Sequence, residues 1–213
     1  MPRLPSARQR APLIHERLGA LYPHATCSLD WRTPWELLVA TILSAQCTDA
    51  RVNLVTPGLF RQFPTPADFA AAPIEEIEEA VRSTGFYRNK AKSLQGAARH
   101  LLEHHGGQLP REIEELVKVP GCGRKTANVV LGEVYGAPAG VVVDTHVGRI
   151  SRKLGLTDQD DPVKAERQLN ECVPQADWRD FGHLVIDHGR KTCQARSPKC
   201  DDCGLYRWCV ARS

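Results

Sequence analysis

The chain has 213 residues, of which 42% are hydrophobic and 25% are charged, and it carries a formal net charge of +3. These proportions are those of an ordinary globular protein, and they exclude a disordered, collagen-like or low-complexity chain. No apolar run approaches the roughly 20 residues of a membrane span, and the N-terminus lacks the apolar stretch of a secretory signal. We therefore expect a cytoplasmic protein that does not bind membranes.

Helical signals follow one another along the chain. Threonine–proline pairs at 33–34 and 65–66 place a capping residue before a proline, as at the start of many helices. Apolar residues recur at three- and four-residue steps, and no period-2 alternation sustains strands. The expected helices are residues 35–46, 74–84, 89–105, 111–119, 124–135, 144–154, 162–173 and 178–191, with Thr48 capping a further one. The sequence therefore predicts an all-α fold, with a Gly- and Pro-containing crossing between lobes near 136–144.

Eight cysteines divide into two groups. Four are scattered without ligand spacing, and the default for such residues is a small buried or bystander side chain. The other four, Cys193, Cys200, Cys203 and Cys209, form a C-x6-C-x2-C-x5-C pattern. Disulfides are disfavoured because nothing directs the chain to an oxidising compartment. Zinc sites usually show two short knuckles, so the unequal loops favour a 4Fe–4S cluster over zinc.

Residues 111–135 are expected to form a helix, a tight turn and a second helix. The turn contains Gly121 and Gly123, which allow positive φ and let the backbone approach another molecule closely. Amide groups at the start of the second helix lack partners, and the helix dipole there favours an anion such as a DNA phosphate. An ordinary helical hairpin whose glycines only shape the corner is the alternative.

Two ionisable residues near this turn each have two interpretations. Lys125 lies in the first turn of the second helix, where the dipole disfavours a cation. A lysine kept partly neutral can form a Schiff base, whereas a charged one would bind phosphate. Asp144 fits the N-cap of the next helix, and its carboxylate could also stabilise a developing positive charge or relay protons. The two roles of Asp144 are compatible, because capping would fix the side chain.

The hairpin PGCGRKTANVV, the stretch VDTHVGR and the four-cysteine tail occur together in this order. With them the chain resembles the endonuclease III family from about residue 10 to the C-terminus, and WELLVATILSAQCTDARVN, STGFYRNKAKSL and HGRKTC extend the likeness. These proteins are bifunctional DNA glycosylase/AP lyases of the helix-hairpin-helix superfamily. Three motifs in the right order make the resemblance specific.

The resemblance implies two helical lobes with DNA in the cleft between them. One lobe would be a six-helix barrel over residues 26–137, with the helix-hairpin-helix motif at about 111–135. The other would join residues 1–25 and 138–213 around a 4Fe–4S cluster held in the loop 193–209. We expect a nucleoid-associated monomer that binds damaged double-stranded DNA.

The resemblance also implies a mechanism, with Lys125 as the catalytic lysine and Asp144 as the catalytic aspartate. An oxidised or saturated pyrimidine is first flipped out of the duplex. The neutral amine of Lys125 attacks C1′ and the base departs, while Asp144 stabilises the oxocarbenium-like charge. β-Elimination from the Schiff base then cuts the strand on the 3′ side.

Other residues are candidates for DNA contact. By resemblance, Gln46 matches the polar residue that fills the gap left by the flipped nucleotide, and Phe86 stands where some relatives have a leucine wedge. The remaining candidates are the hairpin glycines Gly121 and Gly123, Thr126 and His146 beside the catalytic pair, Arg149 as a phosphate contact, and Arg196 and Lys199 in the cluster loop. For His146 a structural role is the alternative.

Two other functions stay open from the sequence. A noncatalytic DNA-binding protein could use the hairpin for phosphates and the cluster as a redox sensor. An adenine glycosylase of the same superfamily shares the hairpin and the cluster, but such enzymes lack a lysine at the position of Lys125.

Overall fold

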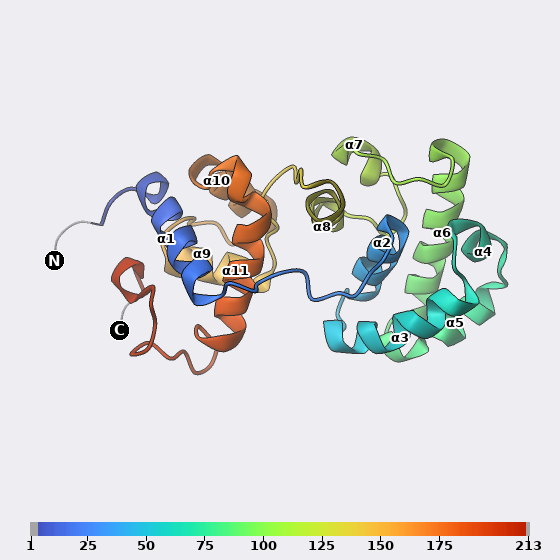
Figure 1. Cartoon of the computed structure of the whole chain (residues 1–213), viewed down its shortest axis with the longest axis horizontal. Coiled ribbons are helices and arrows are strands. Elements are labelled where there is room, and N and C mark those ends of the chain that lie inside the picture. Colours follow the sequence, from blue (N-terminus) through green and yellow to red (C-terminus); the bar gives the residue numbers. More distant parts are fainter. Residues whose placement is uncertain (1–3, 212–213) are drawn as a thin grey trace. The chain divides into compact units, whose positions relative to one another are not determined.

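The computed structural model describes residues 4–211, and every regular element in this part of the chain is a helix (Figure 1). The predicted all-α class is confirmed. The chain divides into two compact units. One unit is Cys27–Gly136, and the other combines the described residues up to Thr26 with those from Ala137 onwards.

The unit Cys27–Gly136 contains seven α-helices and one short 3-10 helix. They are α2 Pro34–Leu43, α3 Asp49–Gln62, α4 Pro66–Ala71, α5 Ile74–Val81, η1 Arg82–Thr84, α6 Tyr87–His105, α7 Ile113–Leu116 and α8 Arg124–Tyr135. Three of them begin as the sequence predicts, because the hydroxyls of Thr33, Thr48 and Thr65 accept hydrogen bonds from backbone amides three residues ahead.

The first predicted helix of this unit is shorter than expected. Its pattern extended over 35–46, but the helix ends at Leu43. Gln46 has φ +53°, in the left-handed region, and a right-handed helix cannot continue through such a residue.

The segment predicted as a helix over 111–119 also forms less helix than expected. Only α7 is helical, and backbone bonds between residues three apart, such as Val119 N to Leu116 O at 3.1 Å, tighten the rest into turns. Pro120 follows, and a proline disfavours the helical conformation of the residue before it.

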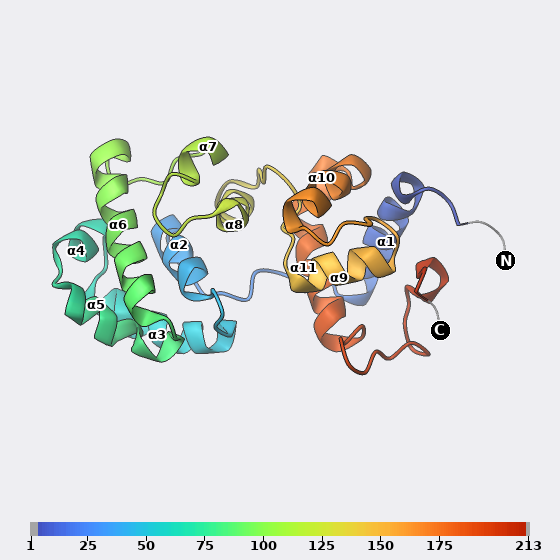
Figure 2. The same ribbon diagram turned by 180° about the vertical axis from the view of Figure 1, so that it is seen from behind.

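Helix α6 lies at the centre of this unit, with α2, α4 and α5 packed against it. Figures 1 and 2, which view the chain from opposite sides, both show α4 and α5 beside α6. Leu37, Phe69 and Leu94 are fully buried in the core, and the ring of Trp35 meets Phe69 edge-on at 5.3 Å between centroids. This packing fixes the loops at the ends of α2 and α6.

The second unit contains α1 Ala7–Leu21, α9 Thr145–Lys153, α10 Pro162–Cys172 and α11 Trp178–Lys191, with the 3-10 turns η2 Gln175–Asp177 and η3 Tyr206–Trp208. Helix α1 packs against α10 and α11 although it is far from them in sequence. The buried Arg10 side chain helps to hold it there, because its guanidinium donates to the carbonyls of Leu154 and Gly155 at 3.0 and 2.7 Å. The N-terminal helix is therefore part of the same core as the C-terminal half.

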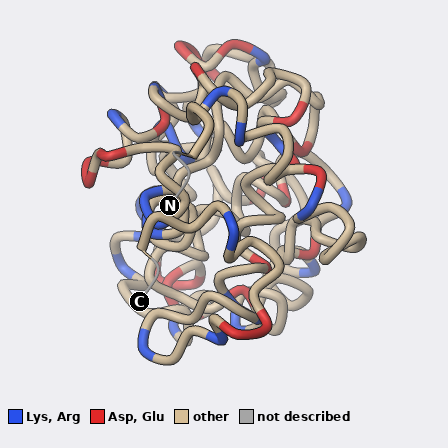
Figure 3. The backbone as a smooth tube through the Cα atoms, turned by 90° about the vertical axis from the view of Figure 1, so that its left-hand side faces the viewer, with Lys and Arg blue, Asp and Glu red and all other residues tan. Residues whose placement is uncertain are grey.

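Charged residues are interspersed over the backbone. Figure 3 shows Lys and Arg positions in blue and Asp and Glu positions in red, mixed over the backbone. This mixture agrees with the small net charge of +3.

Candidate functional site

The hairpin turn between α7 and α8 needs glycine at one position. Gly121 has φ +78°, and a Cβ there would lie 2.8 Å from the Cβ of Ser93 on α6. Gly123 has an ordinary φ of −73°, and a Cβ there would meet nothing within 4 Å. Between them Cys122 is buried, which raises the pKa of its thiol to about 12. The turn is therefore packed closely against α6 at Gly121, and Cys122 is buried, while Gly123 faces open space.

The start of α8 carries two predicted site residues. Gly123 is the N-cap of this helix, and no side chain caps it. Lys125 is the second residue of the helix and is exposed, and Thr126 beside it is half-buried. In residues 4–211 the Lys125 ammonium has no hydrogen bond or ion pair. The first amides of α8 and a free ammonium group thus lie together at one helix start, where an anion is favoured.

Gln46 and Phe86 share an uncommon backbone conformation. Their φ values are +53° and +48°, and within the described residues no other non-glycine residue has positive φ. Both side chains are exposed, Phe86 by 62%. Exposed aromatic residues and non-glycine residues with positive φ are more frequent at binding sites than elsewhere. The two candidates for entering the duplex therefore differ from the other described non-glycine residues in backbone conformation.

Asp144 in the second unit caps α9, which confirms the structural half of its predicted role. Its carboxylate accepts a hydrogen bond from Val147 N at 2.8 Å, and the side chain is half-buried. Such a bond fixes the rotamer of the carboxylate. Helix α9 begins at the next residue, so Asp144 lies at the start of a helix, as Lys125 does at the start of α8.

The other two candidates on α9 are in contact with neighbouring parts of the same unit. The Nδ1 atom of His146 is buried, and a Cβ on Gly189 would lie 2.5 Å from it, so α9 and α11 approach each other closely there. The Arg149 guanidinium donates to the carbonyl of Cys193 at 2.8 Å. DNA contacts by these two residues stay predictions.

The four cysteines of the C-terminal loop line one small pocket. None of the four forms a disulfide, and the pKa of Cys203 is influenced by the other three: burial raises the pKa of its thiol, and their charges raise it further. Among the residues described, no three His, Cys, Asp or Glu side chains are grouped as around a single metal ion. Arg196 and Lys199 are exposed in the same loop.

Two side-chain nitrogens lie close to cysteine sulfurs of this pocket. Arg149 Nη1 lies 3.6 Å from Cys193 Sγ, and His188 Nε2 lies 3.7 Å from Cys203 Sγ. Burial, assisted by the Arg149 charge, lowers the pKa of His188 to about 4, so the imidazole is neutral. N–H groups directed at cysteine sulfurs tune and orient metal-bound thiolates. Four cysteines lining one pocket, with the Arg149 guanidinium close to one of the sulfurs, fit a thiolate-bound metal cluster.

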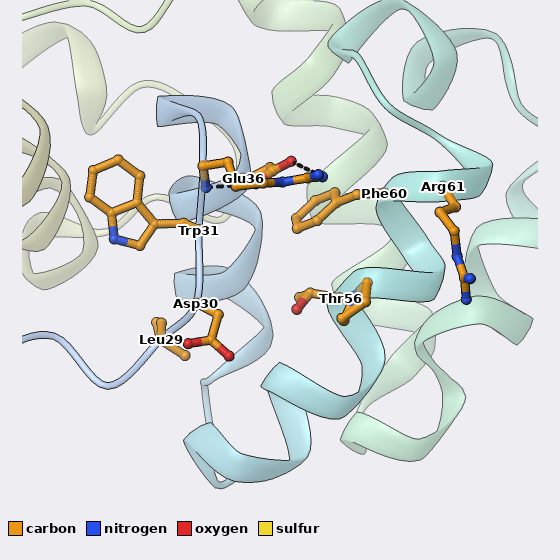
Figure 4. A pocket seen from close by; sticks show the side chains of 9 residues that line it. Leu29, Asp30, Trp31, Glu36, Thr56, Phe60 and Arg61 are labelled. Carbon is orange, nitrogen blue, oxygen red and sulfur yellow. Dashed lines mark hydrogen bonds and ion pairs between the residues drawn. The ribbon is translucent and has the colours of Figure 1, made fainter.

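A larger cavity of about 620 Å³ lies elsewhere, between the segment before α2 and helix α3. Figure 4 shows Thr56 and Phe60 of α3 pointing toward α2, where Glu36 is paired with Arg32 at 2.8 Å. None of the predicted site residues lines this cavity. It is therefore separate from the candidate site.

One residue near the candidate site was missed by the sequence analysis. Lys90 on α6 is 5% exposed, and its ammonium donates to two backbone carbonyls. The signal was present, because Lys90 shares a helical face with Leu94 and Ala97, which are fully buried. A lysine on the buried stripe of a helix indicates a specific partner.

Comparison with known sequences and structures identifies the class of protein. Residues 39–175 match the HhH-GPD superfamily of base excision DNA repair proteins, and the match includes the hairpin, Lys125 and Asp144. Two proteins named endonuclease III are similar over most of their length. The one from Synechocystis sp. is 53% identical over 97% of this chain and 94% of its own, and the one from Bacillus subtilis is 47% identical over 91% and 89%.

Solved structures agree with these relatives. A noncovalent endonuclease III–DNA complex has a TM-score of 0.91 and 43% identity, covering 97% of this chain and 96% of its own. A trapped covalent endonuclease III–DNA intermediate also has a TM-score of 0.91, with 42% identity and 97% of each chain covered. The chain belongs to the endonuclease III family. The predicted family is confirmed, and so is the enzyme class of a base-excision-repair DNA glycosylase and AP lyase.

None of the helices in residues 4–211 is both long and apolar enough to cross a membrane.

Proposed function

We propose that this protein removes oxidised or saturated pyrimidines from duplex DNA and cuts the strand at the resulting site, with Lys125 as the nucleophile. The observation that carries the proposal is the start of α8, where an unpartnered, exposed lysine lies among helix amides that no side chain caps. A phosphate bound by these amides would bring the DNA backbone next to the amine. The start of α8 would thus supply both the amides that bind a DNA phosphate and the lysine nucleophile.

The proposed reaction proceeds through a covalent intermediate. The Lys125 amine attacks C1′, the bond between C1′ and the base breaks, and the base leaves with a proton. The resulting Schiff base acidifies the C2′ proton, and its removal expels the 3′ phosphate by β-elimination. Asp144 is proposed to stabilise the positive charge on the sugar and to assist proton transfer, because its α9 cap bond holds the carboxylate in one rotamer.

Recognition of the lesion would require the damaged nucleotide to leave the helical stack. Gln46 and Phe86 are proposed to occupy the space it vacates, since both are exposed and an aromatic ring stacks on bases. Saturated and oxidised pyrimidines stack less well and leave more readily than intact thymine, which supplies part of the selectivity. Arg196 and Lys199 are proposed to contact phosphates.

The cysteine loop is proposed to hold a 4Fe–4S cluster through Cys193, Cys200, Cys203 and Cys209. The four cysteines line one pocket and form no disulfide, and nitrogens of Arg149 and His188 lie close to two of the sulfurs. When bound, such a cluster would supply a structural cross-link for this loop. Four cysteine ligands imply no open coordination position for chemistry.

Borohydride trapping on a duplex with one thymine glycol tests the nucleophile. Wild type should give a covalent protein–DNA adduct, and Lys125→Met should give none while its affinity for uncleaved duplex stays within about threefold of wild type, because one exposed charge adds little to binding. Lys118→Met, on the same hairpin and also exposed, is the matched control and should trap normally. An adduct mapped to another side chain would contradict the assignment of Lys125 as the nucleophile. No adduct in wild type would favour a noncatalytic DNA-binding protein.

A further inference from the structure

A buried lysine joins the two loops that carry Gln46 and Phe86. The Lys90 ammonium on α6 lies 2.8 Å from the carbonyl oxygen of Leu43 and 2.8 Å from that of Thr84. Leu43 ends α2, three residues before Gln46, and Thr84 ends η1, two residues before Phe86. One side chain thus contacts the backbone just ahead of both left-handed residues.

These contacts have a clear physical cause. The last carbonyls of a helix have no partner within the helix, and they form the negative end of its dipole. An ammonium group between two such ends satisfies both carbonyls and is attracted by both dipoles. Burial lowers the pKa of Lys90, and the nearby Cys47 opposes that shift. The side chain is 5% exposed, so water does not replace these bonds.

The conformations of the two loops are costly by themselves. A glutamine and a phenylalanine in the left-handed region persist only where the surrounding structure holds them. The chain just after each residue continues in α3 or α6, and Lys90 fastens the chain just before it. Each left-handed residue is therefore held from both sides.

We propose that Lys90 is a positioning residue for base flipping: it fixes the Gln46 loop and the Phe86 loop at one separation, so that both enter the duplex as a preformed pair. The proposal rests on the proposed function, since it requires that these two residues occupy the space of a flipped nucleotide. Preformed loops lose little conformational freedom on binding. Without Lys90 the two loops would have to be ordered separately, and flipping would slow while the lysine chemistry stayed intact.

The test separates flipping from chemistry by using two DNA probes. The first is a duplex with one thymine glycol, in which the base must be flipped, and single-turnover base release is measured. The second is a single-stranded oligonucleotide with one abasic site, in which nothing is flipped, and borohydride trapping is measured. Lys90→Met should slow base release about 10-fold or more, because small misplacements at a reacting centre are costly, and should leave trapping nearly unchanged.

Two further variants complete the design. Lys90→Arg keeps a charged donor for the two carbonyls and should recover much of the base-release rate. Lys92→Met removes an exposed lysine from the same helix and should behave as wild type. In hydrogen exchange, Lys90→Met should speed exchange at residues 44–48 and 84–88 together, with the amides of α4 and α8 unchanged.

Several outcomes would overturn the proposal. Equal loss of base release and trapping in Lys90→Met, wild-type base release, or faster exchange spread over the whole unit would each do so. If Lys90→Met does not fold, Lys90→Gln, which keeps an uncharged NH2 donor group, takes its place. Lys90→Gln must then also slow base release while leaving trapping on the abasic strand nearly unchanged. Absence of trapping by wild type on the thymine glycol duplex is a different result, because it would refute the proposed function itself.

Discussion

Helices α8 and α9 both start just after a buried residue, but only α9 has an N-cap side chain that bonds to its first amides. Each follows a buried residue, Cys122 before Gly123 and Val143 before Asp144, so each helix start is fixed in its core. At α9 the carboxylate of Asp144 caps the helix by accepting from Val147 N, whereas at α8 Gly123 offers no side chain. The residue type at the N-cap therefore decides whether the first helix amides bond to a side chain of the same protein or stay available to an external anion.

The largest effect is expected when Asp144, the N-cap of α9, is replaced. Asp144→Asn keeps an oxygen that can cap α9 but removes the charge, so base release should fall about 100-fold, as for other lost electrostatic stabilisers. Thermal stability should change little, because asparagine caps as well as aspartate does. Single-turnover base release and a melting curve measure the two effects.

Asp144→Ala is the companion variant, since it removes cap and charge together. It should lose as much activity and, in addition, about 1 kcal/mol of stability. If Asp144→Asn releases the base at the wild-type rate, Asp144 is only a cap.

A smaller effect is expected when the uncapped start of α8 is given a capping side chain. Gly123→Asp would give α8 the cap that α9 has, because the site is open and its φ of −73° suits an aspartate. The new carboxylate would occupy the amides and repel phosphate, so affinity for duplex DNA should fall about 10-fold and the salt dependence should weaken. Fluorescence anisotropy at several salt concentrations measures both.

Gly123→Ser is the neutral control, which caps without a charge and should lose less affinity. Unchanged binding by Gly123→Asp would mean that the α8 amides hold no phosphate.

The smallest effect concerns the buried residues before the two caps. Cys122 can titrate and Val143 cannot, and burial raises the pKa of the Cys122 thiol from its ordinary 9.0 to about 12. Between these values the unfolded chain has lost the thiol proton and the folded chain keeps it. Stability should therefore decrease as pH rises above about 9, because the folded state binds more protons there.

Urea unfolding of wild type and Cys122→Ala between pH 8 and 10.5 isolates this contribution. The difference in stability between the two proteins should shrink as pH rises. A difference that stays constant over this range would show that the thiol is not protected by burial.

Much of the site could be predicted from the sequence because it depends on local chemistry. The threonine caps, the cap at Asp144 and the uncapped, glycine-led start of α8 follow from residue type and position alone. The spacing of the four C-terminal cysteines predicted one shared site, which stays a prediction, and the structure places all four in the lining of one pocket. Repeating apolar residues also predicted most helices and the all-α class.

Other features were decided only by packing between distant segments. Helix periodicity extended over Gln46 and over 111–119, but a left-handed residue and a tight hairpin replaced helix there. The contacts of Lys90 join carbonyls 47 and 6 residues away, and those of Arg10 join α1 to a turn more than 140 residues later. Sequence pattern records which face of a helix is buried, whereas the partner of a buried charge is chosen by how helices meet in three dimensions. The helix caps, most helices and the candidate reactive groups could therefore be predicted from local sequence. The contacts that hold distant loops together were determined only by the packing of the folded core.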